Sequence, residues 1–153
     1  MARQFCHKCD KHQKAVAVQL ALMLAETEQS MLKRRKIVAV VDDDPSTLRA
    51  METLLDAHGF ATKVFASAEE FLARKTTIRI DCLLLDIHLG GGMSGIELRH
   101  QLTASDSTLP VIFVTGLEDE TIRRQALKAG CIAFLRKPFE ARQLIAAIEK
   151  AAP

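Results

Sequence analysis

Aromatic residues are scarce in this sequence of 153 residues, which contains no Trp, no Tyr and seven Phe. A nucleic-acid platform built from stacked aromatic rings is therefore not expected. Glycine and proline are also few, at 7 and 4 residues, which excludes collagen-like and low-complexity disordered chains. Four cysteines do not make the disulfide framework of a small secreted protein. With 48% hydrophobic and 26% charged residues, the composition is that of one soluble globular domain.

The sequence also lacks a hydrophobic run long enough to cross a membrane. The most apolar stretch, Ala15–Ala25, has about eleven residues and is interrupted by Gln19, whereas a spanning helix needs about 20. Lysines precede this stretch as they do in a signal peptide, but no cleavage pattern follows it. Cys82 and Cys131 lie in apolar runs and are expected to be small core side chains. We therefore expect a cytoplasmic protein that does not associate with membranes.

Positive charge is concentrated near the N-terminus. The formal net charge is +2, yet residues 1–35 contain seven Lys or Arg and only three Asp or Glu, so the remainder is mildly acidic. This asymmetry predicts a basic N-terminal extension, residues 1–35, followed by one domain at residues 36–153. Direct DNA binding is not expected, because the excess of basic residues belongs to this extension and not to the whole chain. The basic run Lys33–Lys36 is expected to be a solvent-exposed link between the extension and the domain. The alternative is that these four residues contact DNA.

Short apolar runs alternate with amphipathic segments from Lys36 onward. Asp44 before Pro45 is a good helix N-cap, and Ser67–Glu70 and Ser94–Glu97 have the spacing of capping boxes. The alternation predicts an α/β fold of the flavodoxin-like (βα)₅ type, with a parallel sheet in strand order 2-1-3-4-5. The predicted strands are residues 37–41, 60–65, 80–85, 110–114 and 131–135, and the predicted helices begin near residues 45, 68, 95, 118 and 140.

Polar residues with related chemistry stand at the ends of four of these strands: Asp42 and Asp43, Asp86, Thr115, and Lys137. The carboxyl ends of parallel strands meet at one edge of the sheet, so these side chains are expected to face one crevice. Several carboxylates placed together repel one another unless a cation is present. Mg²⁺ takes oxygen ligands and leaves positions for phosphate oxygens. The residues therefore predict a metal-assisted phosphoryl site with a carboxylate nucleophile.

Other common catalytic motifs are absent. Gly90-Gly91-Gly92 is not followed by Lys-Ser/Thr, so it is not a P-loop, and no Gly-x-Gly-x-x-Gly follows the first strand. No Gly-x-Ser-x-Gly elbow supports serine hydrolase chemistry. A hydrolase of small phosphate esters is disfavoured because no second catalytic acid is evident.

Four motifs at these strand ends, in this order, resemble the receiver domain of bacterial two-component response regulators. They are Val40–Asp44, Leu83–Asp86, Val114–Gly116 and Phe134–Phe139. The resemblance covers Lys36 to the C-terminus. It implies a phosphoacceptor protein rather than an enzyme, of the single-domain type, because no length is left for an output module. Its phosphoryl donor would be a sensor histidine kinase or a histidine phosphotransfer protein, and its output a downstream protein target.

The resemblance also implies roles for individual residues. Asp86 looks like the residue that becomes 4-aspartylphosphate. Asp43 resembles the direct Mg²⁺ ligand and Asp42 a ligand through water, and the backbone carbonyl of His88 would be a third protein ligand. The side chain of His88 is expected to be solvated, with an imidazole ligand or a phosphohistidine as the alternatives.

The implied switch residues lie on the last two strands. Thr115 resembles the hydroxyl that closes on the phosphoryl group, and Lys137 the lysine that pairs with it, before a cis bond to Pro138. Phe134 resembles the aromatic residue that turns inward on activation, although a plain core role is the alternative. The phosphoryl group adds about −1.5 to −2 charges. It would change the surface formed by the helix at 118–129, the strand at 131–135 and the helix at 140–151.

Two departures from the family pattern are evident. The loop from Asp86 to Gly95 is one residue longer than usual, lacks a proline and contains three consecutive glycines. Gly116 stands where alanine is commoner. Neither change removes a chemical group, but the glycines raise the entropy of the loop. The alternatives are therefore an adaptor that no longer depends on phosphorylation, and an intermediate that passes phosphate to a histidine protein.

The N-terminal extension permits several interpretations. Cys6, Cys9 and His7 or His12 offer zinc ligands, but a second ligand pair at zinc-finger spacing is missing. Apolar residues between about Gln13 and Lys33 would form an amphipathic helix that packs on the domain or pairs with a second copy in a homodimer. A flexible leader is the plain alternative.

Overall fold

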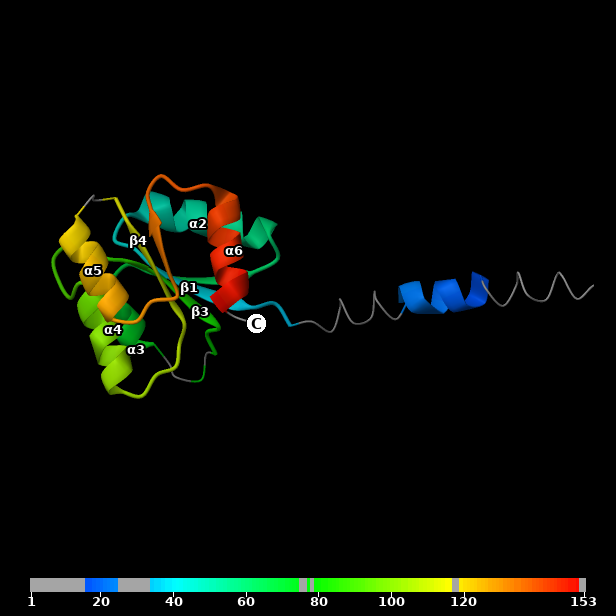
Figure 1. Ribbon diagram of the computed structural model, residues 1–153, viewed down its shortest axis with the longest axis horizontal. Coiled ribbons are helices and arrows are strands. Elements are labelled where there is room, and N and C mark those ends of the chain that lie inside the picture. The colour runs from blue at the N-terminus through cyan, green and yellow to red at the C-terminus, as the bar shows by residue number, and fades with distance from the viewer. Residues whose placement is uncertain (1–15, 25–33, 75–76, 78, 117–118, 152–153) are drawn as a thin grey trace, which may run out of the picture. The chain divides into compact units, whose positions relative to one another are not determined.

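The computed structural model describes residues 16–24, 34–74, 77, 79–116 and 119–151 (Figure 1). The chain divides into two units, Met1–Arg34 and Arg35–Pro153. The second unit contains, in order, β1 (Ile37–Val41), α2 (Pro45–Ala57), β2 (Ala61–Phe65), α3 (Ala68–Ala73), β3 (Cys82–Asp86), α4 (Gly95–Ala104), β4 (Val111–Thr115), α5 (Glu120–Lys128), β5 (Ala133–Arg136) and α6 (Ala141–Ala151).

The five strands form one parallel sheet in the order β2-β1-β3-β4-β5, which confirms the predicted topology. β1 and β3 are adjacent, with Val41 opposite Leu85. β3 and β4 are adjacent, with Asp86 opposite Val114. The strand order reverses between β1 and β3, and ligands of such sheets bind beyond the carboxyl ends at this point.

Alternate residues of the central strands face two separate hydrophobic layers. Val38 and Val40 pack with residues of α2 and α6, whereas Ala39 and Val41 pack with residues of α3, α4 and α5. In Figure 1, α2 and α6 lie on one side of the sheet and the other three helices lie on the opposite side. Both faces of β1, β3 and β4 are therefore buried, as their continuous apolar runs predict.

The predicted helix starts are largely confirmed. The Asp44 carboxylate accepts the backbone N–H groups of Ser46 and Thr47 at the start of α2. Ser94 and Glu97 form a complete capping box at the start of α4. The box predicted at Ser67–Glu70 is only half formed. Ser67 accepts the Glu70 N–H, but the Glu70 carboxylate accepts the N–H of Ala66, 2.6 Å away, rather than that of Ser67.

Some element boundaries differ from the prediction by one or two residues. β3 begins at Cys82 rather than Ile80, because Asp81 bends away and its carboxylate accepts the N–H of Ile37 at 2.8 Å. β5 is Ala133–Arg136 rather than residues 131–135. α5 begins at Glu120 because Asp119 caps it, accepting the N–H groups of Thr121 and Ile122. These shifts leave the polar strand ends in their predicted positions.

In the first unit, residues 16–24 are helical and expose their apolar side chains. Leu20, Leu22 and Met23 are 58%, 57% and 61% exposed. The predicted helix is thus present over these residues, and its remaining length lies outside the described residues, as do Cys6, His7, Cys9 and His12 of the zinc alternative. Within the described residues, no helix combines the length and the apolar character needed to cross a membrane.

Candidate functional site

Asp42, Asp86, Thr115 and Lys137 meet at the carboxyl edge of the sheet. Asp86 and Thr115 are the last residues of β3 and β4, and Asp42 directly follows β1. The register of the three strands places these positions side by side. Lys137, just after β5, is tied to the same edge because its backbone N–H donates to the carbonyl of Thr115 at 2.8 Å. The sequence-based prediction of a common crevice is therefore met for these four residues.

The Lys137 ammonium bridges two of the carboxylates. Its Nζ lies 2.6 Å from Oδ2 of Asp42 and 2.7 Å from Oδ2 of Asp86. The two carboxylate side chains are 4% and 10% exposed, and the Lys137 side chain is 29% exposed. Charged hydrogen bonds of this length are strong, and partial burial reduces their screening by solvent. Lys137 is thus the internal counterion of this acidic cluster.

Burial and pairing act in opposite directions on the pKa values in the cluster. Burial raises the pKa of the Asp42 carboxyl, and the hydrogen bond from Lys137 offsets only part of this effect. Burial alone would lower the pKa of Lys137, but its hydrogen bonds to Asp42 and then Asp86 outweigh it and hold that pKa above the ordinary value. Lys137 is therefore charged at neutral pH, and Asp42 is the carboxylate whose ionised form burial disfavours.

Asp43 and His88 lie at the solvent side of the cluster. The exposed Asp43 carboxylate accepts the backbone N–H of Gly90 through Oδ2 at 3.0 Å. The His88 backbone N–H donates to Oδ1 of Asp86 at 2.9 Å, which orients the carboxylate that the sequence predicts to accept phosphate. The His88 side chain is exposed, in agreement with the solvated side chain expected from the sequence.

One contact of His88 was not expected from the sequence. Its Nδ1 lies 3.4 Å from Oγ1 of Thr115, whose side chain is fully buried. The roles of donor and acceptor depend on the tautomer of the imidazole, and the distance is long for a hydrogen bond. The imidazole therefore lies over the hydroxyl that the family resemblance assigns to switching.

Phe134 lies one strand further out, in β5. Its side chain is half-buried and packs against the hydrophobic layer shared by α3, α4 and α5. This position serves core packing, and the predicted inward turn on activation stays a prediction.

The donor set suits a hard divalent cation. Asp42, Asp43 and Asp86 supply carboxylate oxygens, and the backbone carbonyl of His88 follows two residues after Asp86. Within the described residues, no three His, Cys, Asp or Glu side chains form a preformed cage for a metal ion. Mg²⁺ does not require one, because it keeps several waters and uses one or two protein carboxylates. The residues therefore fit Mg²⁺, and Lys137 supplies positive charge at the same edge without it.

Gly95 fixes the backbone beneath Asp86. A Cβ atom at position 95 would lie 2.2 Å from the carbonyl oxygen of Asp86, a separation that no side chain tolerates. The Gly95 N–H also donates to the carbonyl of Ile87 at 3.0 Å. The start of α4 therefore packs directly against the end of β3, which holds the Asp86 backbone in place.

The glycine-rich loop is ordered by two carboxylates. Besides the bond from Gly90 to Asp43, the Met93 N–H donates to Oε1 of Glu69 at 2.8 Å. The contact of Glu69 was missed from the sequence, because Glu69 stands inside a segment that has the spacing of a capping box. Only the fold brings α3 next to this loop.

Little internal space exists at the acidic cluster. A cavity of about 10 Å³ lies under Asp42, Asp86 and Lys137, which corresponds to about one water molecule. A ligand of Asp86 would therefore reach this carboxylate from the solvent side rather than from the cavity beneath it.

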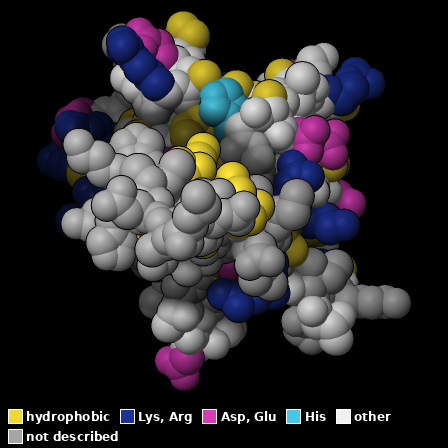
Figure 2. Space-filling view, turned by 90° about the vertical axis from the view of Figure 1, so that its right-hand side faces the viewer, with side chains coloured by type: hydrophobic (Ala, Val, Ile, Leu, Met, Phe, Trp, Pro, Cys, Tyr) yellow, Lys and Arg dark blue, Asp and Glu magenta, His cyan; other side chains and the backbone are white. Residues whose placement is uncertain are grey.

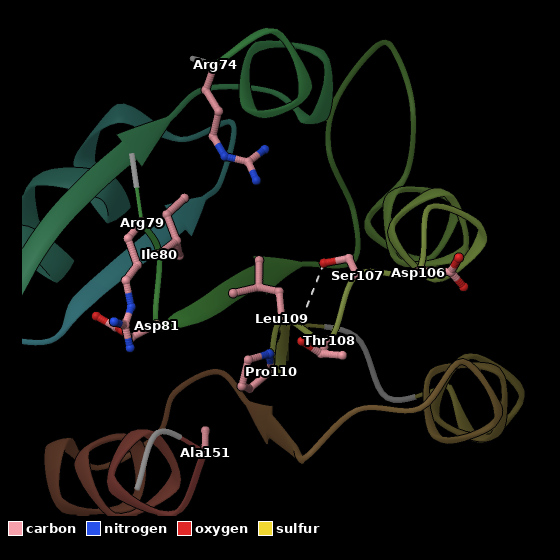
Figure 3. Close-up of a pocket in the computed structure, with 10 residues that line it drawn as sticks. All are labelled: Arg74, Arg79, Ile80, Asp81, Asp106, Ser107, Thr108, Leu109, Pro110 and Ala151. Carbon is pink, nitrogen blue, oxygen red and sulfur yellow. Dashed lines mark hydrogen bonds and ion pairs between the residues drawn. The ribbon is translucent and has the colours of Figure 1, made fainter. Parts of the chain in front are cut away.

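A larger cleft, of about 540 Å³, lies at the opposite edge, near the amino ends of β3 and β4 (Figure 3). Its cations have partners within the chain. Arg79 pairs with Asp81 at 3.0 Å, and the Arg74 guanidinium stacks 3.7 Å from the ring centroid of Phe71 and donates to its carbonyl. Ligands of such sheets bind at the carboxyl edge instead. The acidic cluster is therefore the better candidate site.

The described side chains on the face in Figure 2 carry charges of both signs. Among the described side chains that Figure 2 displays, Lys and Arg are interspersed with Asp and Glu rather than gathered into one stripe. A basic stripe is the electrostatic footprint expected of a nucleic-acid-binding face.

Curated proteins with similar sequences are response regulators. The chain is 34% identical over 123 residues to the response regulator protein TmoT of Ectopseudomonas mendocina, covering 80% of this chain and 56% of that protein. It is 38% identical over 114 residues to the transcriptional regulatory protein FixJ of Rhizobium meliloti (strain 1021), covering 74% and 55%. The chain thus spans about half the length of these curated relatives.

Solved structures of receiver domains have the same fold as this chain. The crystal structure of FixJ-N superposes with a TM-score of 0.71 at 36% identity, covering 77% of this chain and 94% of that one. A CheY-like receiver domain protein from Methanospirillum hungatei JF-1 gives 0.70 at 29% identity, covering 76% and 92%. Residues 38–149 match the family model of the response regulator receiver domain. This match spans most of the chain and includes every strand-end residue of the acidic cluster, so the chain belongs to the response regulator receiver domain family.

Proposed function

We propose that this protein accepts a phosphoryl group on Asp86 from a histidine kinase or a histidine phosphotransfer protein, with Mg²⁺, and signals through a change in its surface. The observation that carries the proposal is the bridge from Lys137 Nζ to Oδ2 of Asp86 and Oδ2 of Asp42, at 2.7 and 2.6 Å. A carboxylate nucleophile, a paired lysine and a neighbouring hydroxyl at one sheet edge are the groups that phosphoryl transfer needs.

In the transfer step, an Asp86 oxygen forms a bond to phosphorus as the bond from phosphorus to the donor imidazole nitrogen breaks. The leaving nitrogen keeps the electron pair of that bond. Asp43, Asp86 and the His88 carbonyl would hold Mg²⁺ directly and Asp42 through water, and the bound ion would supply charge neutralisation at the phosphoryl oxygens. The His88 N–H orients the nucleophile through Oδ1 of Asp86, and Lys137 can move its hydrogen bond from the carboxylate to the new phosphoryl group.

The output follows from the same two strands. Thr115 ends β4 and Lys137 follows β5, so a phosphoryl group on Asp86 would have both residues at the same edge of the sheet. β5 is an edge strand, and Figure 1 displays it between α5 and α6. A movement of Thr115 and Lys137 would therefore alter the α5–β5–α6 surface, where Phe134 is half-buried, and change the binding of a downstream protein.

The protein acts in the cytoplasm, where the free thiols of Cys82 and Cys131 stay reduced.

The test is incubation of the full chain with Mg²⁺ and a small acyl phosphate, followed by intact-mass measurement. We expect one added phosphoryl group that hydroxylamine removes, and none in Asp86→Asn. Asp106→Asn is the matched control, because it neutralises an exposed aspartate near the amino edge of the sheet. Equal incorporation into Asp86→Asn, or none into the unmodified chain, would overturn the proposal and favour an adaptor that does not depend on phosphorylation.

A second measurement separates a terminal receiver from a relay intermediate. The phosphorylated chain is mixed with a histidine phosphotransfer protein, and loss of the aspartyl phosphate is compared with appearance of phosphohistidine. Slow hydrolysis without transfer indicates a terminal receiver. Transfer that is faster than hydrolysis indicates a relay.

A further inference from the structure

Two carboxylates from different elements hold the glycine-rich loop by its backbone. Asp43, after β1, accepts the Gly90 N–H through Oδ2 at 3.0 Å. Glu69, in the first turn of α3, accepts the Met93 N–H through Oε1 at 2.8 Å. The loop between β3 and α4 is therefore fixed at both ends of the segment 90–93, once to the expected Mg²⁺ ligand and once to a neighbouring helix.

Glycine at positions 90 and 92 leaves room for these two close approaches. A Cβ atom at position 90 would lie 2.7 Å from Oδ2 of Asp43, and one at position 92 would lie 2.7 Å from Oε1 of Glu69. Both separations are shorter than real Cβ atoms show. Gly90 and Gly92 therefore let the carboxylates reach the backbone, in addition to making the chain flexible.

Glu69 differs from the other glutamates near this loop. Glu70 bonds to the N–H of Ala66, and Glu97 bonds to Ser94, so both stabilise only their own helix starts. Glu69 also interacts with Ser67 at its own helix start, but in addition its carboxylate contacts a residue 24 positions away in sequence. The backbone N–H of Met93 is also the largest influence on its carboxyl, and it holds the pKa of Glu69 below the ordinary value. Glu69 is thus ionised at neutral pH and available as an acceptor.

We propose that Glu69 is a positioning residue for the metal site: by holding the Gly90–Met93 segment, it keeps the Gly90 N–H on Asp43 and orients that carboxylate for Mg²⁺. The inference rests on the Mg²⁺ site of the proposed function. A glycine-rich loop has high conformational entropy when it is free, so fixing it beforehand lowers the cost of binding. The ionised Asp43 carboxylate has about four lone-pair sites and retains acceptors for a cation after one hydrogen bond.

The test is a Mg²⁺ titration of the full chain, in which amide chemical shifts and calorimetry both report the affinity for the ion. Groups that orient metal ligands typically contribute about 10–100-fold to metal affinity, and Glu69 acts one contact further away. We therefore expect Glu69→Ala to weaken Mg²⁺ binding about 3- to 10-fold. Glu69→Gln keeps an acceptor oxygen and should retain affinity within about twofold. Glu70→Ala removes the same charge from the same turn and should bind as the unmodified chain does.

Two further readouts separate positioning from a general structural effect. The Met93 amide should exchange its hydrogen faster in Glu69→Ala, whereas the melting temperature should match that of Glu70→Ala. Gly92→Ala should weaken Mg²⁺ binding as Glu69→Ala does, and the double variant should be no worse than either single one, because both act through the same contact.

Equal Mg²⁺ affinities in Glu69→Ala and Glu70→Ala would overturn the inference. Additive losses in the Glu69→Ala/Gly92→Ala double variant would also overturn it. In both cases the proposed function would stand if Asp86 were still phosphorylated. Absence of Mg²⁺ binding by the unmodified chain would instead overturn the metal-dependent function, and the inference with it.

Discussion

Nζ of Lys137 donates a hydrogen bond to Oδ2 of Asp86 at 2.7 Å, across 51 residues of sequence. The bond links the loop after β5 to the end of β3, and the same ammonium reaches Asp42 at 2.6 Å. The lysine thus holds the proposed phosphoacceptor before any phosphoryl group arrives. A phosphoryl group on Asp86 would also attract this ammonium, so a single side chain would contact Asp86 in both the resting and the modified states.

Replacing this lysine should destabilise the fold. Lys137→Met leaves Asp42 and Asp86 partly buried without their counterion, and we expect a loss of about 1–2 kcal/mol at pH 7, since the lysine is partly exposed. Because the Lys137 pKa is raised, its contribution is complete below the ordinary value of 10.5 and is lost as the pH rises through the folded value. Urea unfolding followed by circular dichroism measures both effects.

Lys150→Met is the matched control for this variant. Lys150 is an exposed lysine in the last turn of α6. Its replacement should change the free energy of unfolding by less than about 0.5 kcal/mol. Equal losses in the two variants would contradict the role of Lys137 as internal counterion. Added Mg²⁺ should restore part of the stability of Lys137→Met, because a cation that binds only the folded state stabilises it.

The acidic cluster was predictable from the sequence because its members lie at strand ends. Once the apolar runs are taken as parallel strands, chain direction alone brings Asp42, Asp86 and Thr115 to one edge. No side-chain geometry is needed for that step. The strand order was predicted as the common topology of five βα units. The two buried layers follow from the continuous apolar runs, which indicate strands that are covered on both faces.

The contacts across the glycine-rich loop were not predictable in this way. Glu69 and Glu70 are adjacent glutamates in the same helical turn, and local patterns treat them alike. The structure separates them, because Glu70 turns back to Ala66 whereas Glu69 reaches Met93. The N-terminal end of β3 was predicted too early for a similar reason, since Asp81 leaves the strand and its carboxylate accepts the N–H of Ile37. Both are tertiary contacts without a periodic signal.

The side chain of His88 is expected to be dispensable for metal binding. It is exposed and touches Thr115 only at 3.4 Å, whereas the proposed ligand is its backbone carbonyl. His88→Ala should therefore bind Mg²⁺ within about twofold of the unmodified chain, while Asp43→Asn should lose at least about tenfold. Calorimetric titration measures both affinities. A loss in His88→Ala as large as that in Asp43→Asn would indicate that the imidazole itself is a ligand.

Gly95 should be intolerant of any side chain, in contrast to Gly116. A Cβ atom at position 95 would lie 2.2 Å from the Asp86 carbonyl, whereas one at position 116 would have no atom within 4 Å. We expect Gly95→Ala to destabilise the protein by about 1–3 kcal/mol through overpacking. Gly116→Ala should stay within about 0.5 kcal/mol of the unmodified chain. Urea unfolding gives both values, and similar losses would mean that the β3–α4 contact is softer than the geometry indicates.

The capping box at the start of α4 should make stability depend on acid pH. The backbone N–H and the hydroxyl of Ser94 hold the pKa of Glu97 below its ordinary value of 4.5. A lowered pKa contributes stability above the ordinary value, and this contribution is lost as the pH falls through the folded value. Glu97→Gln should therefore lower the free energy of unfolding at pH 7, and its difference from the unmodified chain should shrink in acid.

Ser94→Ala should lower the free energy of unfolding by about 1 kcal/mol at pH 7. Glu52→Gln, at an exposed position within α2, is the control and should show no such pH dependence. A constant difference between Glu97→Gln and the unmodified chain from neutral to acid pH would contradict the assignment, because only the ionised carboxylate accepts both hydrogen bonds at full strength.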